Sequence, residues 1–337
     1  MVYYRKFQVK EVACLEFQGV RWNGRAALAP MAGVADKAFR EICVKFGAGY
    51  TVTEMVSAKG LCMQDRKSRE LLELSAAEHP AAAQIFGDDP VFMAKAAEKC
   101  LSFSPDVIDI NMGCPAPKIA GNGGGCALMR QPELAQQIVA AVCRAVPIPV
   151  SVKMRVGWDA EHVNCVELAK RCEQAGAAML TVHGRTKMQM YAPPVLPEPI
   201  AAVRRAVKIP VAANGEVTDG VSAAKLMEQT GCEAVMVGRG SLGRPWVFRQ
   251  IEAYLADGTV LPEPPAQERM AVMLEHIERT CSYKGQKVAM LEARKHAAWY
   301  MKGIRGAAAL RREICELKTL DELRAIAEKA IEAANAE

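Results

Sequence analysis

The sequence predicts a (β/α)8 barrel followed by a small all-α helical bundle. Short apolar runs of strand length recur eight times in the first 240 residues, about one every 30 residues, and most precede a helical pattern. From residue 267 onward the pattern is purely helical and rich in Ala, Leu, Glu, Lys and Arg. A doubly wound open sheet is the alternative, but no GxGxxG turn follows the first run.

The eight expected strands are three to five residues long, and each fits one βα unit. They are Ala26–Ala29, Gly49–Thr53, Ala81–Ile85, Val107–Ile110, Val150–Val152, Met179–Val182, Val211–Ala213 and Ala234–Val237. Residues typical of helix starts and helix ends stand between these strands. We expect Asp89-Pro90 to start one helix and Pro132 another, with Asn164 and Thr218 as further caps. Three glycines stand where helices should end: Gly47, Gly176 and Gly231.

A polar residue stands at or near the end of most runs, where a parallel barrel builds its ligand site. These residues are Glu54, Gln84, Asn111, Lys153, His183 and Asn214. Any one of them can be a satisfied structural side chain, but six at one rim indicate a ligand pocket. Asn214-Gly215 and Gly238-Arg239-Gly240 follow the last two strands, where such barrels commonly bind a phosphate group.

The stretch 106–129, PDVIDINMGCPAPKIAGNGGGCALM, carries the candidate reactive group. Cys114 lies between Gly113 and Pro115 just after a strand, and a glycine-rich segment follows that we expect to form a flexible flap. A cysteine in a chain with twelve is more often a packed apolar residue. Its place at a strand end favours a chemical role.

Composition narrows the class of protein further. At 337 residues, 51% hydrophobic and 24% charged, the chain is an ordinary globular protein, and a net charge of +5 alone does not imply nucleic acid. Its cysteines form no CxxC pair and no zinc-type cluster, so we expect no metal site and a reducing, cytoplasmic location. Charged residues at positions 5–11 argue against a signal segment, and no apolar run approaches the ~18 residues of a membrane span.

Charge is concentrated in the helical part. We divide the chain into a barrel, residues 1–255, a turn-rich linker, 256–266, and a helical domain, 267–337. The segment 284–312 holds eight basic residues and only Glu292 as an acid, whereas 313–337 is mainly acidic. Lys295, Trp299 and Lys302 share one helical face by spacing. Basic residues interleaved with aromatics suit RNA, although a solvated charged face is the commoner meaning of such a pattern.

The chain resembles the flavin-dependent tRNA-dihydrouridine synthases, and most closely their bacterial B-type branch. The matching stretches are LAPMAGVADKAFR (28–40), TEM (53–55), AAQIFG (82–87), DINMGCPAPK (109–118), VKMRVGW (152–158), TVHGRTKMQMY (181–191), VAANGEV (211–217), MVGRGSLGRPWVF (236–248) and ARKHAAWYMKG (293–303). The resemblance implies an FMN-binding barrel and a helical tRNA-recognition domain. It also implies reduction of uridine in tRNA to 5,6-dihydrouridine with NADPH as electron donor, and no obligate protein partner.

The resemblance also implies roles for individual residues. Cys114 matches the family's general acid, which protonates C5 of the uracil ring. Residues expected to hold FMN are Pro30, Met31, Ala32, Gln84, Lys153, His183, Asn214, Gly215, Glu216, Gly238 and Arg239. Residues expected on the substrate side are Asn111, Arg155, Arg185, Lys295 and Trp299. A uridine must leave its stack to reach a buried cofactor, which accounts for a dedicated RNA-binding domain.

Three departures from the family pattern stand out. Prolines 193, 194, 197 and 199 stiffen the loop after Tyr191, and Glu216 replaces the usual Asp. Cys126 adds a second thiol, which we expect at the far end of the glycine-rich loop from Cys114. Three other functions stay open: an FMN barrel acting on a free pyrimidine or small enone, a non-redox barrel with Lys153 as a Schiff-base lysine, and a non-catalytic RNA-binding protein. The sequence leaves open which uridines and RNAs are modified, NADPH versus NADH, and the oligomeric state.

Overall fold

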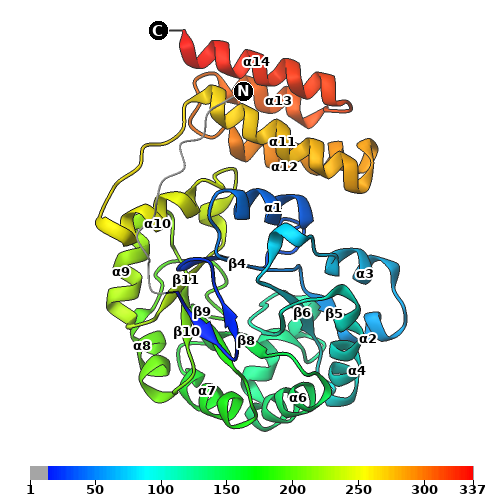
Figure 1. The fold of residues 1–337 in the computed structure, drawn as a ribbon, viewed down its shortest axis with the longest axis vertical. Coiled ribbons are helices and arrows are strands. Elements are labelled where there is room, and N and C mark those ends of the chain that lie inside the picture. The colour runs from blue at the N-terminus through cyan, green and yellow to red at the C-terminus, as the bar shows by residue number, and fades with distance from the viewer. Residues whose placement is uncertain (1–13, 337) are drawn as a thin grey trace.

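A closed parallel barrel forms the first part of the molecule, in a computed structural model that describes residues 14–336 (Figure 1). Its strands are β3 (Ala26–Leu28), β4 (Tyr50–Val52), β6 (Ala81–Phe86), β7 (Val107–Met112), β8 (Val150–Gly157), β9 (Met179–Thr186), β10 (Val211–Asn214) and β11 (Ala234–Val237). The barrel closes because β3 pairs with both β4 and β11, and β4 pairs with β6. The short strand β5 (Val56–Ser57) adds to β6. The predicted (β/α)8 fold is confirmed.

Helices surround the barrel and bury the apolar faces of its strands. They are α1 (Lys37–Lys45), α2 (Ala58–Cys62), α3 (Arg66–Leu72), α4 (Pro90–Cys100), α5 (Pro117–Ala120), α6 (Pro132–Ala145), α7 (Cys165–Gln174), α8 (Pro197–Ala206), α9 (Gly220–Thr230) and α10 (Val247–Asp257). The expected starts of α4 and α6 are confirmed, and the Asp89 carboxylate accepts hydrogen bonds from Val91 N at 2.8 Å and Phe92 N at 3.0 Å. Without this packing, helices this short would be only marginally stable in water.

Two of the expected helix caps differ from the sequence prediction. The Asn164 side chain does not cap α7, because its amide donates to the Met129 carbonyl at 2.7 Å instead. Helix α9 is capped by Asp219 rather than Thr218: the Asp219 carboxylate accepts from Ser222 N at 2.7 Å. Glycines 47, 176 and 231, which follow the C-terminal ends of α1, α7 and α9, adopt positive φ angles, as expected for glycines at helix ends.

A hairpin that the sequence analysis did not predict closes the bottom of the barrel. Strands β1 (Glu16–Phe17) and β2 (Val20–Arg21) pair antiparallel. Phe17 and Trp22 are buried in one cluster with inward residues from the starts of the barrel strands, and the Trp22 ring stacks on Tyr50 at 4.7 Å between centroids. The hairpin therefore excludes water from the end of the barrel opposite the site described below.

The remaining chain forms a helical bundle over one side of the barrel (Figure 1). Its helices are α11 (Ala266–Lys284), α12 (Gln286–Tyr300), α13 (Ala307–Cys315) and α14 (Leu320–Asn335). The bundle core is continuous with Ile42 and Phe46 of α1 and with Trp246. The segment between α10 and α11 is also attached, since Glu263 accepts from Trp246 Nε1 at 2.9 Å. Bundle and barrel therefore share an apolar interface.

Within residues 14–336 no helix is long and apolar enough to cross a membrane. The charged positions 5–11, which argue against a signal segment, lie outside the described residues.

Two buried histidines lie at the junction between bundle and barrel. His276 of α11 and His296 of α12 contact each other, with ring centroids 4.6 Å apart, and both pack on Phe39 of α1. Burial lowers the pKa of His276 to about 4, although Asp36 opposes the shift. Burial and then His276 lower the pKa of His296 well below its usual value. Charged groups facing the pair are Asp36, Lys284, Arg279 and Lys295.

This junction predicts a loss of stability in acid. The unfolded chain binds a proton at each histidine near pH 6.5, whereas folded His276 stays neutral down to about pH 4, so the free energy of unfolding falls as the pH falls through that window. We expect His276→Phe to remove about 3 kcal/mol of the difference in unfolding free energy between pH 7 and pH 4. Urea unfolding at both pH values measures it, with the exposed His162→Gln as control. Equal pH dependence in wild type and His276→Phe would contradict the assignment.

Candidate active site

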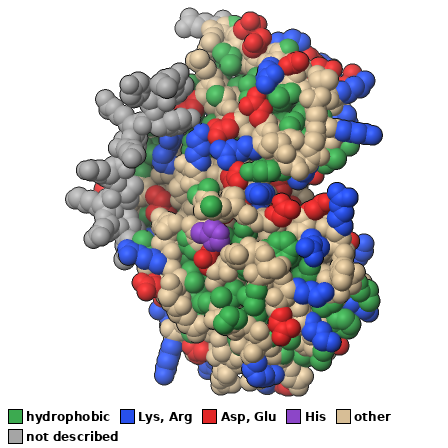
Figure 2. All heavy atoms as spheres, turned by 45° about the vertical axis from the view of Figure 1, so that its right-hand side comes forward, with side chains coloured by type: hydrophobic (Ala, Val, Ile, Leu, Met, Phe, Trp, Pro, Cys, Tyr) green, Lys and Arg blue, Asp and Glu red, His purple; other side chains and the backbone are tan. Residues whose placement is uncertain are grey.

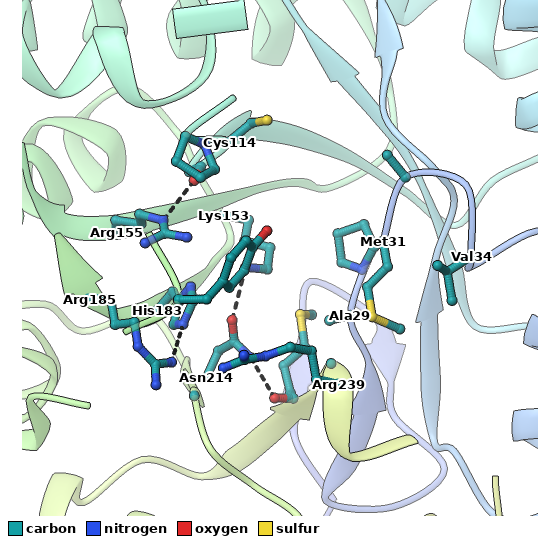
Figure 3. A pocket seen from close by; sticks show the side chains of 18 of the residues that line it. Ala29, Met31, Val34, Cys114, Lys153, Arg155, His183, Arg185, Asn214 and Arg239 are labelled. Carbon is teal, nitrogen blue, oxygen red and sulfur yellow. Dashed lines mark hydrogen bonds between the residues drawn. The ribbon is translucent and has the colours of Figure 1, made fainter. Parts of the chain in front are cut away.

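A pocket of about 650 Å³ opens at the carboxyl ends of the barrel strands (Figure 3). Met31 and Val34 lie across it from Cys114 and Arg155, with Lys153, His183 and Asn214 between them. All the residues expected to hold the cofactor line it: Pro30, Met31, Ala32, Gln84, Lys153, His183, Asn214, Gly215, Glu216, Gly238 and Arg239. Cys114, Asn111, Arg155, Arg185 and Trp299 line it too. Lys295 does not; its ammonium donates to the Gly33 carbonyl.

Lys153 supplies a positive charge near the base of the pocket. Its Nζ donates to Asn214 Oδ1 at 3.0 Å, and Asn214 Nδ2 donates to the Met236 carbonyl at 2.7 Å, which fixes the orientation of the amide. Burial, and next the Arg155 guanidinium, lower the pKa of Lys153 to about 8. The side chain is therefore mostly protonated at neutral pH. Because its acceptor is a neutral amide, its charge is available to an anionic ligand.

His183 is a neutral hydrogen-bond donor beside this lysine. Burial and the nearby Lys153 lower the pKa of His183 to about 2. Arg185 Nη1 lies 3.2 Å from His183 Nε2. A guanidinium can only donate, so Nε2 accepts and the imidazole proton lies on Nδ1.

Arg155 and Arg185 are buried and hold the backbone around the pocket. Arg155 donates to Gly113 O at 3.0 Å, to Thr186 O at 2.8 Å and to Met190 O at 2.7 Å. Arg185 donates to Ala192 O at 2.8 Å and pairs with Glu216. The two guanidiniums therefore fasten the segment 186–192, and the Arg155 bond ties the turn before Cys114 to β8. Glu216 lines the pocket, but one of its carboxylate oxygens is engaged by Arg185.

Tyr191 is a pocket residue that the sequence analysis did not select. Arg155 and Arg239 lie over its ring, with guanidinium carbons 5.5 Å and 5.1 Å from the centroid. Its side chain is half exposed at the pocket mouth. A half-exposed aromatic ring beside two cations is a platform on which a flat base can stack. The motif TVHGRTKMQMY contained it, but nothing in the spacing marked it as a pocket residue.

Cys114 is held by a chain of hydrogen bonds that starts in the barrel core. Asn111 Oδ1 accepts from Cys114 N at 2.9 Å and from Gly113 N at 3.1 Å. Asn111 Nδ2 donates to Gln84 Oε1 at 2.9 Å, and Gln84 Nε2 donates to Asp109 Oδ2 at 2.6 Å. Asp109 accepts in turn from Ser151 Oγ at 2.5 Å. A carboxyl group in the core thus fixes which way both amides face, and the sequence analysis treated Asp109 only as part of a strand.

The second thiol lies closer to Cys114 than we predicted. Cys126 N donates to Cys114 O at 3.1 Å, so it is not at the far end of the loop. Gly125 between them has φ +58°, and a Cβ there would lie 2.8 Å from Cys114 O, so the fold requires glycine. Cys126 is fully buried and burial raises its pKa to about 12, whereas Cys114 lines the pocket. The glycine-rich segment is packed as α5 and a 3-10 turn, Gly125–Arg130.

The part of the pocket that follows β11 has the composition of an anion site. Gly238 and Gly240 line it beside Arg239. A Cβ on Gly238 would lie 3.8 Å from Ala29 Cβ and Met31 Sδ, so this glycine lies beside the residues that follow β3. Across residues 14–336, no group of three or more His, Cys, Asp and Glu side chains is arranged to hold a metal ion.

Fold and site together define a (β/α)8-barrel enzyme whose mouth combines a thiol, a buried lysine and an anion site. The profile described as "Dihydrouridine synthase (Dus)" matches residues 27–335. The chain is 42% identical to tRNA-dihydrouridine synthase B of Pseudomonas aeruginosa, over 88% of this chain and 90% of that protein. It is 39% identical to probable tRNA-dihydrouridine synthase 1 of Synechocystis sp., over 95% and 90%. The chain therefore belongs to the dihydrouridine synthase family, and its resemblance to the B-type branch is confirmed.

Proposed function

We propose that this chain is a tRNA-dihydrouridine synthase that uses FMN and NADPH to reduce the C5–C6 double bond of uridines in tRNA. The observation that carries the proposal is that Cys114 and Lys153 line one pocket together with the anion site at Gly238 and Arg239. The names of the relatives supply the substrate and the product. The many free thiols, from Cys43 to Cys315, suit a cytoplasmic enzyme.

The pocket residues fit FMN by size and by donor set. A volume of about 650 Å³ lies in the usual range for small-molecule and cofactor sites. Apolar wall is provided by Met31, Met236 and Leu242, which suits a flat ring. Lys153 donates to the neutral amide of Asn214, so its charge is available to an anionic ligand. Arg239 lines the pocket between Gly238 and Gly240, a donor set that suits a phosphate.

Each group would act on a different part of the bound molecules. Arg239 with the glycines would bind the phosphate, Gln84 and His183 would hydrogen-bond the ring, and Lys153 would stabilise negative charge on the reduced ring. The chemistry that FMN would supply there is the transfer of hydride from NADPH to C6 of the uracil ring. The pocket walls would exclude water from that transfer.

Cys114 would complete the reduction by donating its proton to C5 of the uracil. Burial raises the pKa of the Cys114 thiol, so it stays protonated at neutral pH and is suited to act as an acid rather than a nucleophile. Asn111 accepts a hydrogen bond from Cys114 N and Arg155 donates one to Gly113 O, and together they fix the backbone on which the thiol lies. Tyr191 would stack on the extruded base.

The division of labour follows the architecture. The barrel, which ends at residue 255 in our domain division, would carry out the chemistry. The helices from residue 267 would bind tRNA through exposed basic residues. Figure 2 shows Lys and Arg side chains on both parts, on either side of the notch between them. We propose no obligate protein partner.

The first expected result is that purified protein is yellow and releases one FMN per chain on denaturation. The reason is that every proposed contact to FMN is non-covalent. Mass spectrometry of the released chromophore identifies it, and absorbance gives the stoichiometry. Release of FAD, or a colourless protein that sodium borohydride links to an aldehyde at Lys153, would contradict the proposal. Reduction of free uracil but not of unmodified tRNA would instead favour an enzyme for free pyrimidines.

A further inference from the structure

The loop after β3, residues 30–36, carries pocket residues and is held by the helical bundle. Its Met31 carbonyl accepts from Val34 N at 3.0 Å and Ala35 N at 2.9 Å, which forms a tight turn around Gly33. The Gly33 peptide is bound from two sides. Its N–H donates to Glu54, which lies just after β4, and its carbonyl accepts from Lys295 of α12.

A second lysine of the bundle reaches the same loop. Lys284 Nζ lies 2.6 Å from Asp36 Oδ2 and also 2.6 Å from Glu292 Oε2. Asp36 is the N-cap of α1 and accepts from Phe39 N at 3.0 Å. Burial acts to lower the pKa of Lys284, but Asp36 raises it above its usual value, so this contact is an ion pair at neutral pH. The loop is therefore fastened to α11 and α12 at two points.

The same end of α12 also contacts the neighbouring loop of the pocket, which follows β11. Trp299, one helical turn after Lys295, lines the pocket. Gly243 follows the anion-site loop and has φ +65°; a Cβ there would lie 2.3 Å from Trp299 C and 2.4 Å from Tyr300 N. Only glycine permits this approach. Helix α12 thus touches both the loop that carries Met31 and the loop that carries Arg239.

We propose that Lys295 is a positioning residue for the cofactor loop, so that the helical bundle is part of the cofactor site as well as an RNA-binding arm. The inference rests on the proposed function for the identity of the cofactor, FMN. The Lys295 ammonium is already bound to a carbonyl, and an RNA phosphate would have to displace that bond. Losing it would free the turn that places Pro30, Met31 and Ala32 against the cofactor.

Paired substitutions test this role. Lys295→Met removes the ammonium and keeps the aliphatic stem, and Lys302→Met makes the same change at an exposed lysine just past the end of α12. The dissociation constant for FMN is measured by flavin fluorescence without RNA. We expect it to rise roughly tenfold in Lys295→Met, as for one charge-assisted hydrogen bond, and to stay unchanged in Lys302→Met. Lys295→Arg should restore most of the affinity.

The salt dependence of tRNA binding is a second measurement, and here Lys302→Met rather than Lys295→Met should have the effect. Lys295→Met should leave the log–log slope of affinity against salt unchanged, whereas Lys302→Met should flatten it by roughly 0.7–0.9. The inference is overturned if Lys295→Met flattens the slope while FMN binds as in wild type. In that case Lys295 contacts RNA directly.

Hydrogen–deuterium exchange separates this inference from the proposed function. In ligand-free protein, Lys295→Met should speed the exchange of amides in residues 31–36, and Lys302→Met should not. This result does not depend on flavin. If wild type binds no FMN, the proposed function fails, and the exchange rates alone decide whether Lys295 holds the loop. Unchanged exchange in Lys295→Met would overturn it.

Discussion

Replacing Cys114 with alanine should lower the rate of uridine reduction in tRNA by roughly 10²–10⁴-fold, the usual contribution of a general acid. Cys114 lines the pocket, and burial raises the pKa of its thiol, so it is the protonated group closest in character to the acid that C5 would require. NADPH oxidation with an artificial electron acceptor should stay near the wild-type rate, because the thiol takes no part in it. Comparing the two rates in one preparation is the measurement.

Cys126→Ala is the matched control for this substitution. Both thiols belong to the same packed segment, and the Cys126 amide donates to the Cys114 carbonyl. The Cys126 side chain is fully buried, however, and burial raises its pKa to about 12. We expect Cys126→Ala to cost some stability. The ratio of the rate of uridine reduction to the rate of NADPH oxidation should stay nearly unchanged. If Cys126→Ala abolished uridine reduction and Cys114→Ala did not, the proton donor would have been assigned to the wrong cysteine.

The barrel could be predicted from the sequence because each strand is an apolar run and each helix has local signals. Every expected run coincides with a barrel strand. The hairpin β1–β2 was not predicted, because two-residue strands leave no periodic pattern. Its burial depends on Trp22 and Phe17 filling the open bottom of a barrel, which is a tertiary requirement.

Strands β8 and β9 run further than their apolar segments, and this extension builds the site. Lys153 and Arg155 are two residues apart, as are His183 and Arg185, so within extended strands each pair faces the same side. Met154 and Val156 face the opposite side and belong to the apolar cluster that packs the strands against the surrounding helices. The polar residues therefore do not end the strands. The patterns Lys-x-Arg and His-x-Arg are visible in the sequence, but a polar residue after an apolar run looks the same whether the strand ends there or continues.

The basic segment 284–312 shows what sequence could not separate. Arg294 donates to the Leu317 carbonyl and its Nε is buried without a partner, and Lys295 donates to Gly33. His296 and Tyr300 of the same helix are buried. These contacts join residues that are more than 20 positions apart. Helical spacing identifies a shared face, but it does not show whether that face meets solvent or another part of the chain.

The surface that remains exposed leads to the second large expected effect. Four basic side chains of the segment 284–312 are exposed and lie outside these internal contacts: Lys287, Lys302, Arg311 and Arg312. Replacing all four with Glu should flatten the log–log dependence of tRNA affinity on salt by about 3, because each phosphate contact contributes roughly 0.7–0.9. At moderate salt this corresponds to a loss of affinity of several hundredfold or more, since repulsion replaces attraction.

The flavin chemistry should survive this charge reversal. The four side chains are exposed, so the fold should lose little stability, and they are not among the pocket-lining residues. NADPH oxidation with an artificial acceptor should therefore stay near wild type while dihydrouridine formation on unmodified tRNA falls. A second variant reverses four exposed lysines on the outer barrel helices α3, α4, α7 and α9: Lys67, Lys95, Lys170 and Lys225. It changes net charge by the same amount, so it separates local phosphate contacts from the overall field of the protein. Equal salt slopes in the two variants would show that the bundle's basic residues are only a solvated face, and the enzyme would then have to recognise tRNA through the barrel mouth alone.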